Sequence, residues 1–219
     1  VSITLYKAGT QDSTTPTIVD GSASGTDNDN DGSYSWTIPS GQPIGTDYKI
    51  KICGATNTST CDESDNVFSI VSQTIQFTQS GDQGNSWNTD QTIGLSAFDG
   101  TQITIRFEGL TGSGFTSDIA LDNIRLYNNG SLIDTESFEN STGWIYANVS
   151  SGDDLDWTLS SNGTGSTDTG PSSASAGTYY IYTEASSNYY KTHFLERTID
   201  LSSYTNTTIK FDYHMYGAD

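Results

Sequence analysis

The chain has 219 residues and carries 8 basic against 27 acidic side chains, a formal net charge of −19. Affinity for nucleic acid rests on clustered Lys and Arg, so this charge excludes an electrostatic nucleic-acid binder and disfavours docking on anionic membranes. No apolar stretch approaches the ~18 residues that a membrane-spanning helix needs, so we expect no membrane insertion. The 13 Tyr, 8 Phe and 4 Trp are typical of a chain that folds, because burying aromatic side chains offsets chain entropy.

Short runs in which apolar and polar residues alternate recur along the chain, between turns rich in Gly, Asn, Asp and Ser. In chain order they include residues 1–6, 48–52, 102–107 and 208–211. Alternation with a period of two is typical of half-buried strands in antiparallel sheets. The sequence therefore predicts an all-β fold.

The first segment, 1–71, contains five strand-like runs, near 1–7, 16–20, 33–38, 47–53 and 66–71. Side chains that recur on one face of successive strands form a core in a sandwich. We expect this core to include Ile3, Leu5, Trp36, Tyr48, Ile50 and Phe68.

Cys53 and Cys61 are the two cysteines of the chain and enclose seven residues. No His or further Cys lies nearby, so the pair does not have the spacing of a zinc site. We interpret it as a disulfide that clips a hairpin. Two unpaired thiols, which fit a reducing compartment, are the alternative.

Residues 1–7, 32–39, 48–52 and 62–70 resemble the KNH-type surface domain of fungal cell-wall proteins and large secreted bacterial proteins. The resemblance implies a small Ig-like sandwich at 1–71.

The rest of the chain resembles the extracellular MAM domain, but with its parts in the reverse order. Residues 111–124 are similar to the last strand of that domain, whereas 138–139, 143–144, 153–157, 169–171, 177–180 and 211–217 are similar to its opening half. The resemblance implies a jelly-roll β-sandwich whose closing half is 72–130 and whose opening half is 131–219. The paired cysteines of animal MAM domains are missing, which puts disulfide-linked dimers in doubt.

This order has two explanations. The two halves pair within one chain as a circularly permuted jelly roll, or each half completes itself with a neighbouring unit of a tandem array. A half sandwich on its own would expose an apolar face and unpaired strand edges, so we expect completion of one kind or the other.

Two sets of acidic residues are candidates for a calcium site. Asp27, Asp29 and Asp31, followed by Gly32, reproduce the first half of a calcium loop, but the twelfth position is Ile38 and not an acid. A polar Asp-rich loop is the other interpretation. In the second set the MAM resemblance implies a calcium or other cation held by Glu139, Asp154, Asp156 and Asp122; surface acids that cap turns are its alternative.

No nucleophile–base pair and no zinc-ligand spacing can be found, so we expect no catalytic activity. His193 and His214 are interpreted as structural, and the tyrosines at 179–190 as sheet packing rather than a sugar platform. The leading hypothesis is a non-catalytic repeat module of a large secreted, cell-surface protein, acting in adhesion or as a filament or stalk subunit. Its expected partners are copies of itself or adjacent repeats, and surface glycans. A glycan-binding accessory module of a secreted hydrolase is the alternative.

Overall fold

The computed structural model describes residues 1–19, 34–54, 59–140, 144 and 152–218, in two compact units, Val1–Ile75 and Gln76–Asp219. Strands form the regular structure of these residues, together with one short 3₁₀ turn, η2 (Ser96–Phe98). The all-β prediction is therefore confirmed. No helix among the described residues is both long enough and apolar enough to cross a membrane.

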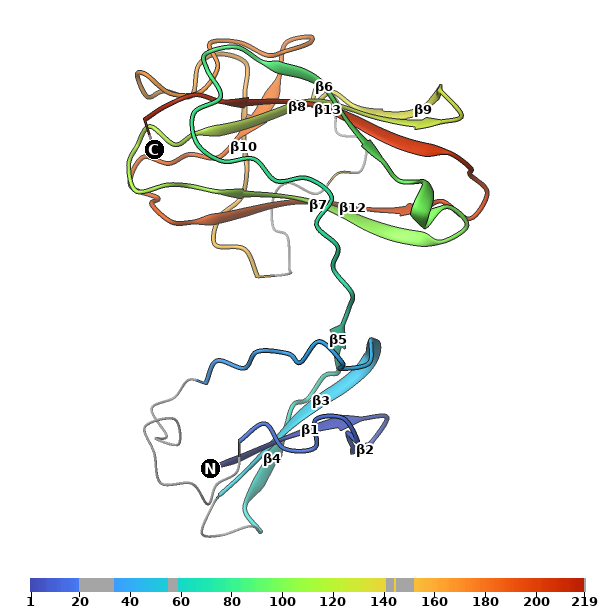
Figure 1. Cartoon of the computed structure of the whole chain (residues 1–219). Coiled ribbons are helices and arrows are strands. Elements are labelled where there is room, and N and C mark those ends of the chain that lie inside the picture. Colours follow the sequence, from blue (N-terminus) through green and yellow to red (C-terminus); the bar gives the residue numbers. More distant parts are fainter. Residues whose placement is uncertain (20–33, 55–58, 141–143, 145–151, 219) are drawn as a thin grey trace. The chain divides into compact units, whose positions relative to one another are not determined.

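The first unit is built around one antiparallel sheet (Figure 1). Its strands are β1 (Ser2–Lys7), β2 (Thr10–Gln11), β3 (Gly45–Cys53), β4 (Cys61–Glu63) and β5 (Phe68–Ile70). The order is β2-β1-β3-β4, and β5 also pairs with β3.

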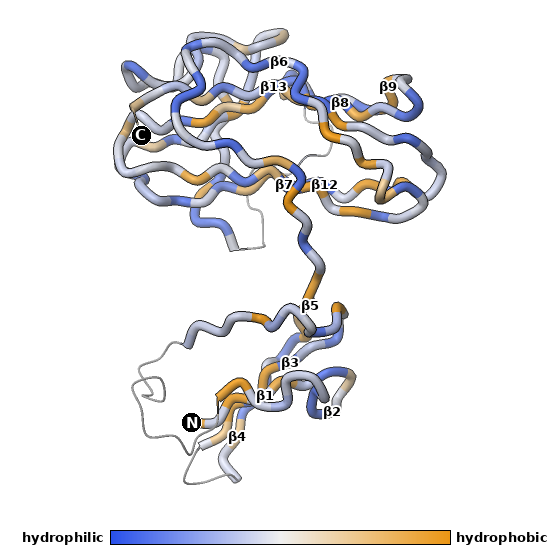
Figure 2. The backbone as a smooth tube through the Cα atoms, in the orientation of Figure 1, coloured by the Kyte–Doolittle hydropathy of each residue, from blue (hydrophilic) through white to orange (hydrophobic). Residues whose placement is uncertain are grey.

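The core of the first unit is small and agrees largely with the expected set. Leu5, Tyr48 and Ile70 are buried, and Ile18, Trp36, Ile50 and Phe68 pack against them partly buried. Hydrophobic stretches accordingly coincide with β1 and β3 in Figure 2. Ile3 is partly buried outside this cluster, whereas Ile18 and Ile70, which were not expected in the core, belong to it.

Two of the five expected strands of this unit are absent from the described residues. Of the run at 16–20, the described residues contribute only an isolated bridge between Ile3 and Val19, and β2 pairs with β1 further along, at Tyr6 and Lys7. Residues 34–38 form no strand, and of their large apolar side chains Trp36 packs on the core whereas Tyr34 and Ile38 are exposed. Pro39 follows directly and has no backbone N–H to donate to a strand ladder.

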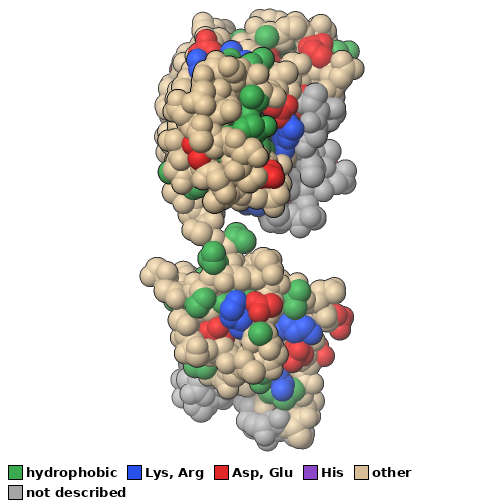
Figure 3. All heavy atoms as spheres, turned by 90° about the vertical axis from the view of Figure 1, so that its right-hand side faces the viewer, with side chains coloured by type: hydrophobic (Ala, Val, Ile, Leu, Met, Phe, Trp, Pro, Cys, Tyr) green, Lys and Arg blue, Asp and Glu red, His purple; other side chains and the backbone are tan. Residues whose placement is uncertain are grey.

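Cys53 and Cys61 face each other in the β3–β4 pair and are joined by a disulfide with a Cα–Cα distance of 4.1 Å. This is the bridge that the sequence predicts. Ion pairs also link strands of this unit: Lys7 Nζ lies 2.8 Å from Asp47 Oδ1, and Lys49 Nζ lies 3.2 Å from Glu63 Oε1. Figure 3 shows basic and acidic side chains beside one another on its surface.

The second unit is a β-sandwich of two layers (Figure 1). One layer has the order β10-β11-β8-β13-β6, with β9 also paired to β8, and the other contains β12 and β7. The strands are β6 (Asn88–Gly94), β7 (Gln102–Leu110), β8 (Ile119–Asn128), β9 (Ser131–Glu136), β10 (Thr158–Ser160), β11 (Tyr180–Tyr182), β12 (Thr192–Asp200) and β13 (Thr207–Met215).

Both layers combine strands from 72–130 with strands from 131–219. β13 lies between β6 and β8, and β7 pairs with β12 along its whole length. In the core between the layers, Phe138 and Trp157 belong to the same cluster as Leu121 and Ile124. The two segments therefore form one sandwich within one chain, which is the first of the two arrangements that their order allows.

Candidate functional site

The antiparallel pairing of β8 and β13 places Asp122 opposite Asp212. The β13–β8 register shifts between Lys210 and Asp212, and Asn123 has a left-handed φ of 54°, so both strands are irregular where the acids meet. Asp122 is fully buried and Asp212 is 2% exposed. Because buried carboxylates are costly unless they accept hydrogen bonds or have a cation, their partners define what this site can do.

Backbone amides satisfy Asp122. Its Oδ1 accepts a hydrogen bond from the amide of Asn123 at 2.6 Å. Its Oδ2 accepts from the amides of Ser175 and Ala176 at 2.9 and 3.0 Å. Asp122 thus fixes the start of the 175–179 segment to the sheet.

Asp212 has a mixed set of partners. Its Oδ1 accepts from the Asp90 amide at 2.9 Å and from Arg125 Nη2 at 3.2 Å. Its Oδ2 accepts from Ser175 Oγ at 2.7 Å and from Asn123 Nδ2 at 3.1 Å. This carboxylate joins β6, β8 and β13 to the same segment.

Glu139 holds the other end of the 175–179 segment. Its Oε1 accepts hydrogen bonds from the amides of Thr178 and Tyr179 at 2.5 and 2.7 Å. Gly177 has a φ of 68°, and a Cβ added there would lie 2.5 Å from Glu139 Oε1. We refer to Asp122, Asp212 and Glu139 as the carboxylate clamp, since together they fix residues 175–179.

Burial changes the pKa of one member of the clamp, Asp122. Burial raises the pKa of Asp122 to about 6, and the neighbouring Asp212 acts in the same direction, while the amides of Ala176, Asn123 and Ser175 oppose the shift. The Asp122 carboxylate therefore titrates closer to neutral pH than an ordinary aspartate does.

The expected calcium ligands are only partly brought together. Asp122 and Glu139 flank one segment, but Asp154 contacts Thr192, the first residue of β12, in the other layer. There its Oδ2 accepts from the amide and hydroxyl of Thr192 at 2.9 and 3.0 Å, which lowers its pKa. Asp156 is exposed.

The carboxylate oxygens of the clamp are arranged to accept hydrogen bonds from amides and not to bind a cation. The amides that contact Asp122 and Glu139 point their N–H groups at the oxygens that calcium would need. In the described parts of the chain, no three His, Cys, Asp or Glu side chains gather into a metal-binding group. Asp27, Asp29 and Asp31 lie outside the described residues.

Both histidines are buried within the second unit. The ring of His214 lies edge-on to Trp87, with ring centroids 5.5 Å apart, and burial lowers its pKa to about 4. His193 is 1% exposed, and burial lowers its pKa too. Both positions agree with the structural role expected for them.

The tyrosines between residues 179 and 190 divide into two groups. Tyr180 and Tyr182 are buried and pack with Ala120. Tyr179, Tyr189 and Tyr190 are 38%, 44% and 68% exposed. The expectation of sheet packing thus holds for Tyr180 and Tyr182 and not for the other three.

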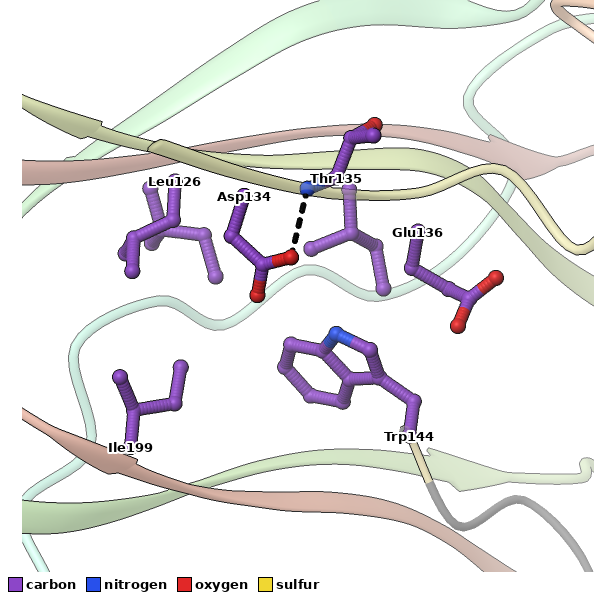
Figure 4. A pocket seen from close by; sticks show the side chains of 8 residues that line it. Leu126, Asp134, Thr135, Glu136, Trp144 and Ile199 are labelled. Atoms are coloured by element: carbon purple, nitrogen blue, oxygen red, sulfur yellow. Dashed lines mark hydrogen bonds between the residues drawn. The ribbon is translucent and has the colours of Figure 1, made fainter. Parts of the chain in front are cut away.

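A small cavity lies between the layers, beside Glu136 and Trp144 (Figure 4). Its volume is about 10 Å³, roughly the space of one water molecule. Glu136 Oε1 accepts the amide of Phe138 at 2.7 Å, and Asp134 pairs with Arg197. The cavity is too small for an organic ligand.

Sequence reasoning missed Asp212, Asp118 and Glu136, all of them buried. For Asp212 a signal was present, because this acid interrupts the aromatic run 211–213 of a strand whose two faces are both covered. A charged side chain in such a strand indicates that hydrogen bonds compensate its buried charge.

No protein-family model matches this chain, and no solved structure matches it.

Proposed function

We propose that this chain is a non-catalytic module of a secreted, cell-surface protein and that it acts in adhesion. The observation that carries the proposal is the way three acids are used: Asp122 and Asp212, which are buried, and Glu139, which is half-buried, direct their oxygens at the 175–179 segment. Carboxylates engaged in this way stabilise a surface loop, as a rigid recognition module requires.

The disulfide supports the extracellular part of the proposal. Bridges such as Cys53–Cys61 persist in oxidising compartments and are rare in the cytosol. A net charge of −19 keeps such a module soluble, and it also makes two copies repel at low ionic strength. Adhesion between copies or adjacent repeats should therefore strengthen when salt screens this repulsion.

Bead aggregation tests the adhesive role. Beads that carry the full chain are expected to cluster with one another, more strongly as ionic strength rises. Beads that carry the heat-denatured chain serve as the control. If folded and denatured chains cluster equally at every salt concentration, copies of this chain are not its partner.

A glycan-binding role is the second candidate, and a separate observation favours it. Tyr189 and Tyr190 are exposed on a turn that buried Thr111 holds, since Thr111 Oγ1 donates to Asn188 O at 2.6 Å and accepts the Lys191 amide at 2.8 Å. Tyr190 has a left-handed φ of 55°, an unfavourable conformation for a bulky residue that often marks a functional site.

A glycan array distinguishes the two candidates. Glycan binding by the full chain that Tyr190→Ala abolishes, and that Tyr34→Ala in the first unit leaves unchanged, would support the accessory-module function. Tyr34 is the control because it is another exposed tyrosine, at 46% against 68% for Tyr190, and it lies outside the turn. Equal binding by both variants would exclude the tyrosine turn as the site.

A further inference from the structure

Six Asn-x-Ser/Thr triplets occur in the chain, and the functions proposed above use none of them. This triplet is the acceptor signal for N-linked glycosylation of secreted proteins. The triplets begin at Asn57, Asn129, Asn140, Asn148, Asn162 and Asn206. Because a chain rich in Asn, Ser and Thr contains some triplets by chance, the structure has to show which of them an enzyme can reach.

The asparagines that begin these triplets lie at the surface. Four of them are in the described part of the chain, and all four are exposed: Asn129, Asn140, Asn162 and Asn206. Of the six other described asparagines, only Asn66 and Asn85 are exposed. A bulky glycan needs an exposed asparagine, so the rest of each triplet decides between the four. The third residue of the Asn140 triplet lies outside the described residues.

The triplets at Asn162 and Asn206 serve the fold. Thr164, the third residue of the first, is 3% exposed and faces Asp118. Thr207, the middle residue of the second, is fully buried, and its hydroxyl donates to Asp99 Oδ1 at 2.5 Å. An enzyme that has to bind the whole triplet therefore cannot reach either of them in the folded chain.

The Asn129 triplet lies on an open hairpin. Asn129 and Gly130 form the two-residue turn between β8 and β9, with positive φ values of 49° and 78°. Asn-Gly is a favoured pair in such turns, so the turn alone accounts for these two residues. It does not account for Ser131, which is exposed at the start of β9 and completes the triplet. All three residues are exposed, and the middle one has no side chain to obstruct an enzyme.

The side-chain nitrogen of Asn129 is held at the surface. Its Nδ2 donates to Thr205 Oγ1 at 3.0 Å, and Thr205 is itself exposed. A glycosylated amide keeps one N–H, so this hydrogen bond can remain after modification. The hairpin lies at the opposite end of β8 from the loop 111–118, to which Tyr190 is hydrogen-bonded through Gly112 O. A glycan on Asn129 would therefore leave the tyrosine turn free.

We propose that Asn129 is an acceptor site for N-linked glycosylation and that the folded chain presents it. In this reaction Asn129 Nδ2 forms a bond to the anomeric carbon of an oligosaccharide that is carried on a lipid diphosphate. The bond between that carbon and the diphosphate breaks, the lipid diphosphate leaves, and the amide releases one proton. The inference rests on the extracellular part of the proposed function, because oligosaccharyltransferases act on exported chains.

Glycosylation of the purified, folded full chain tests the site. The chain is incubated with a single-subunit oligosaccharyltransferase and its lipid-diphosphate-linked oligosaccharide, and mass spectrometry of peptides locates the glycan. We expect modification at Asn129 and at least about tenfold less at Asn162, since Thr164 becomes accessible only by local unfolding. A synthetic peptide of residues 158–168 should be accepted, which would show that the fold protects Asn162.

Two variants of Ser131 keep the hairpin turn unchanged. Ser131→Ala should abolish modification at Asn129, whereas Ser131→Thr should retain it. Asn85→Gln is the control, because Asn85 is exposed but begins no triplet, and it should leave the glycan unchanged. Circular dichroism shows that each variant is folded.

Two results would overturn the proposal. One is a folded chain that stays unmodified at Asn129 while a synthetic peptide of residues 125–133 is accepted. The other is a glycan on Asn129 that survives Ser131→Ala. Bead aggregation uses the unmodified chain, so failure of the adhesive function and failure of this site are told apart.

Discussion

Asp122 and Asp212 are opposite each other in the β8–β13 ladder, but Arg125 contacts Asp212 at 3.2 Å whereas the partners of Asp122 are backbone amides. Two buried acids at one point of a sheet thus differ in how their charge is compensated. Burial raises the pKa of Asp122 from 3.8 to about 6, and the first prediction follows from this shift.

Asp122→Asn should change the pH dependence of stability. The folded-state pKa of about 6 lies above the ordinary value of 3.8, so the contribution of this acid is fully present below pH 3.8 and is lost as pH rises through 6. The difference in unfolding free energy between parent and variant should therefore move in favour of the parent by about 2–3 kcal/mol from pH 7 to pH 4. Urea unfolding across this range measures it, and a difference that does not vary with pH would count against the raised pKa.

His214→Phe should show the opposite dependence. The pKa of His214 is lowered to about 4 from an ordinary 6.5, so its contribution is present above pH 6.5 and is lost as pH falls through 4. Relative to the variant, the parent should lose about 2–3 kcal/mol over that interval. The same urea series measures this, and an imidazole NMR titration with a midpoint near 6.5 would contradict the prediction.

Gly177→Ala should cost more stability than Gly81→Ala. Both glycines have a similar positive φ, 68° and 71°, so both variants carry a backbone penalty of about 1 kcal/mol. Only at Gly177 does the new Cβ meet Glu139, at 2.5 Å, whereas nothing lies within 4 Å of it at Gly81.

The excess cost of Gly177→Ala should shrink when Glu139→Ala is added, because that change removes the side chain in the way. Urea unfolding of the two single variants and the double variant measures this coupling. Equal losses for Gly177→Ala and Gly81→Ala would mean that the Glu139 contact is not tight.

Replacing Cys53 and Cys61 together by Ser should destabilise the first unit alone. Models based on loop entropy give about 2–3 kcal/mol for so short a closure. Calorimetry should show a lower transition for the first unit and an unchanged one for the second, whose core is its own. The parent chain treated with reductant should behave as the double variant does, and an unchanged profile in both would refute the prediction.

The sequence predicts the features that depend on neighbouring residues better than those that depend on residues far apart in the chain. Alternation along 48–52 and 208–211 is a local property, and both runs are strands, within β3 and β13. The run at 34–38 has the same alternation but forms no strand, since strand formation depends on a neighbouring edge that the run itself does not encode. The Cys53–Cys61 bridge follows from short spacing.

The carboxylate clamp was harder to predict because it depends on register. Asp122 and Glu139 were expected to lie close to each other, and the 175–179 segment does connect them. Asp154 instead accepts the amide of Thr192 at the start of β12. No short sequence motif specifies this contact, because the two residues are far apart in the chain. Asp212 meets Asp122 only through the register shift in β13.

The position of β13 has a consequence for how the second unit folds. This strand, residues 207–215, follows every other strand of the unit in sequence yet lies inside the sheet between β6 and β8, and β7 pairs with a strand that ends at residue 200. Pairings between residues so far apart close late, because loop-closure entropy is lost before their contacts form. During synthesis from the N-terminus, β7 therefore lacks β12 until the chain has reached about residue 200, and β6 and β8 lack β13 until about residue 215.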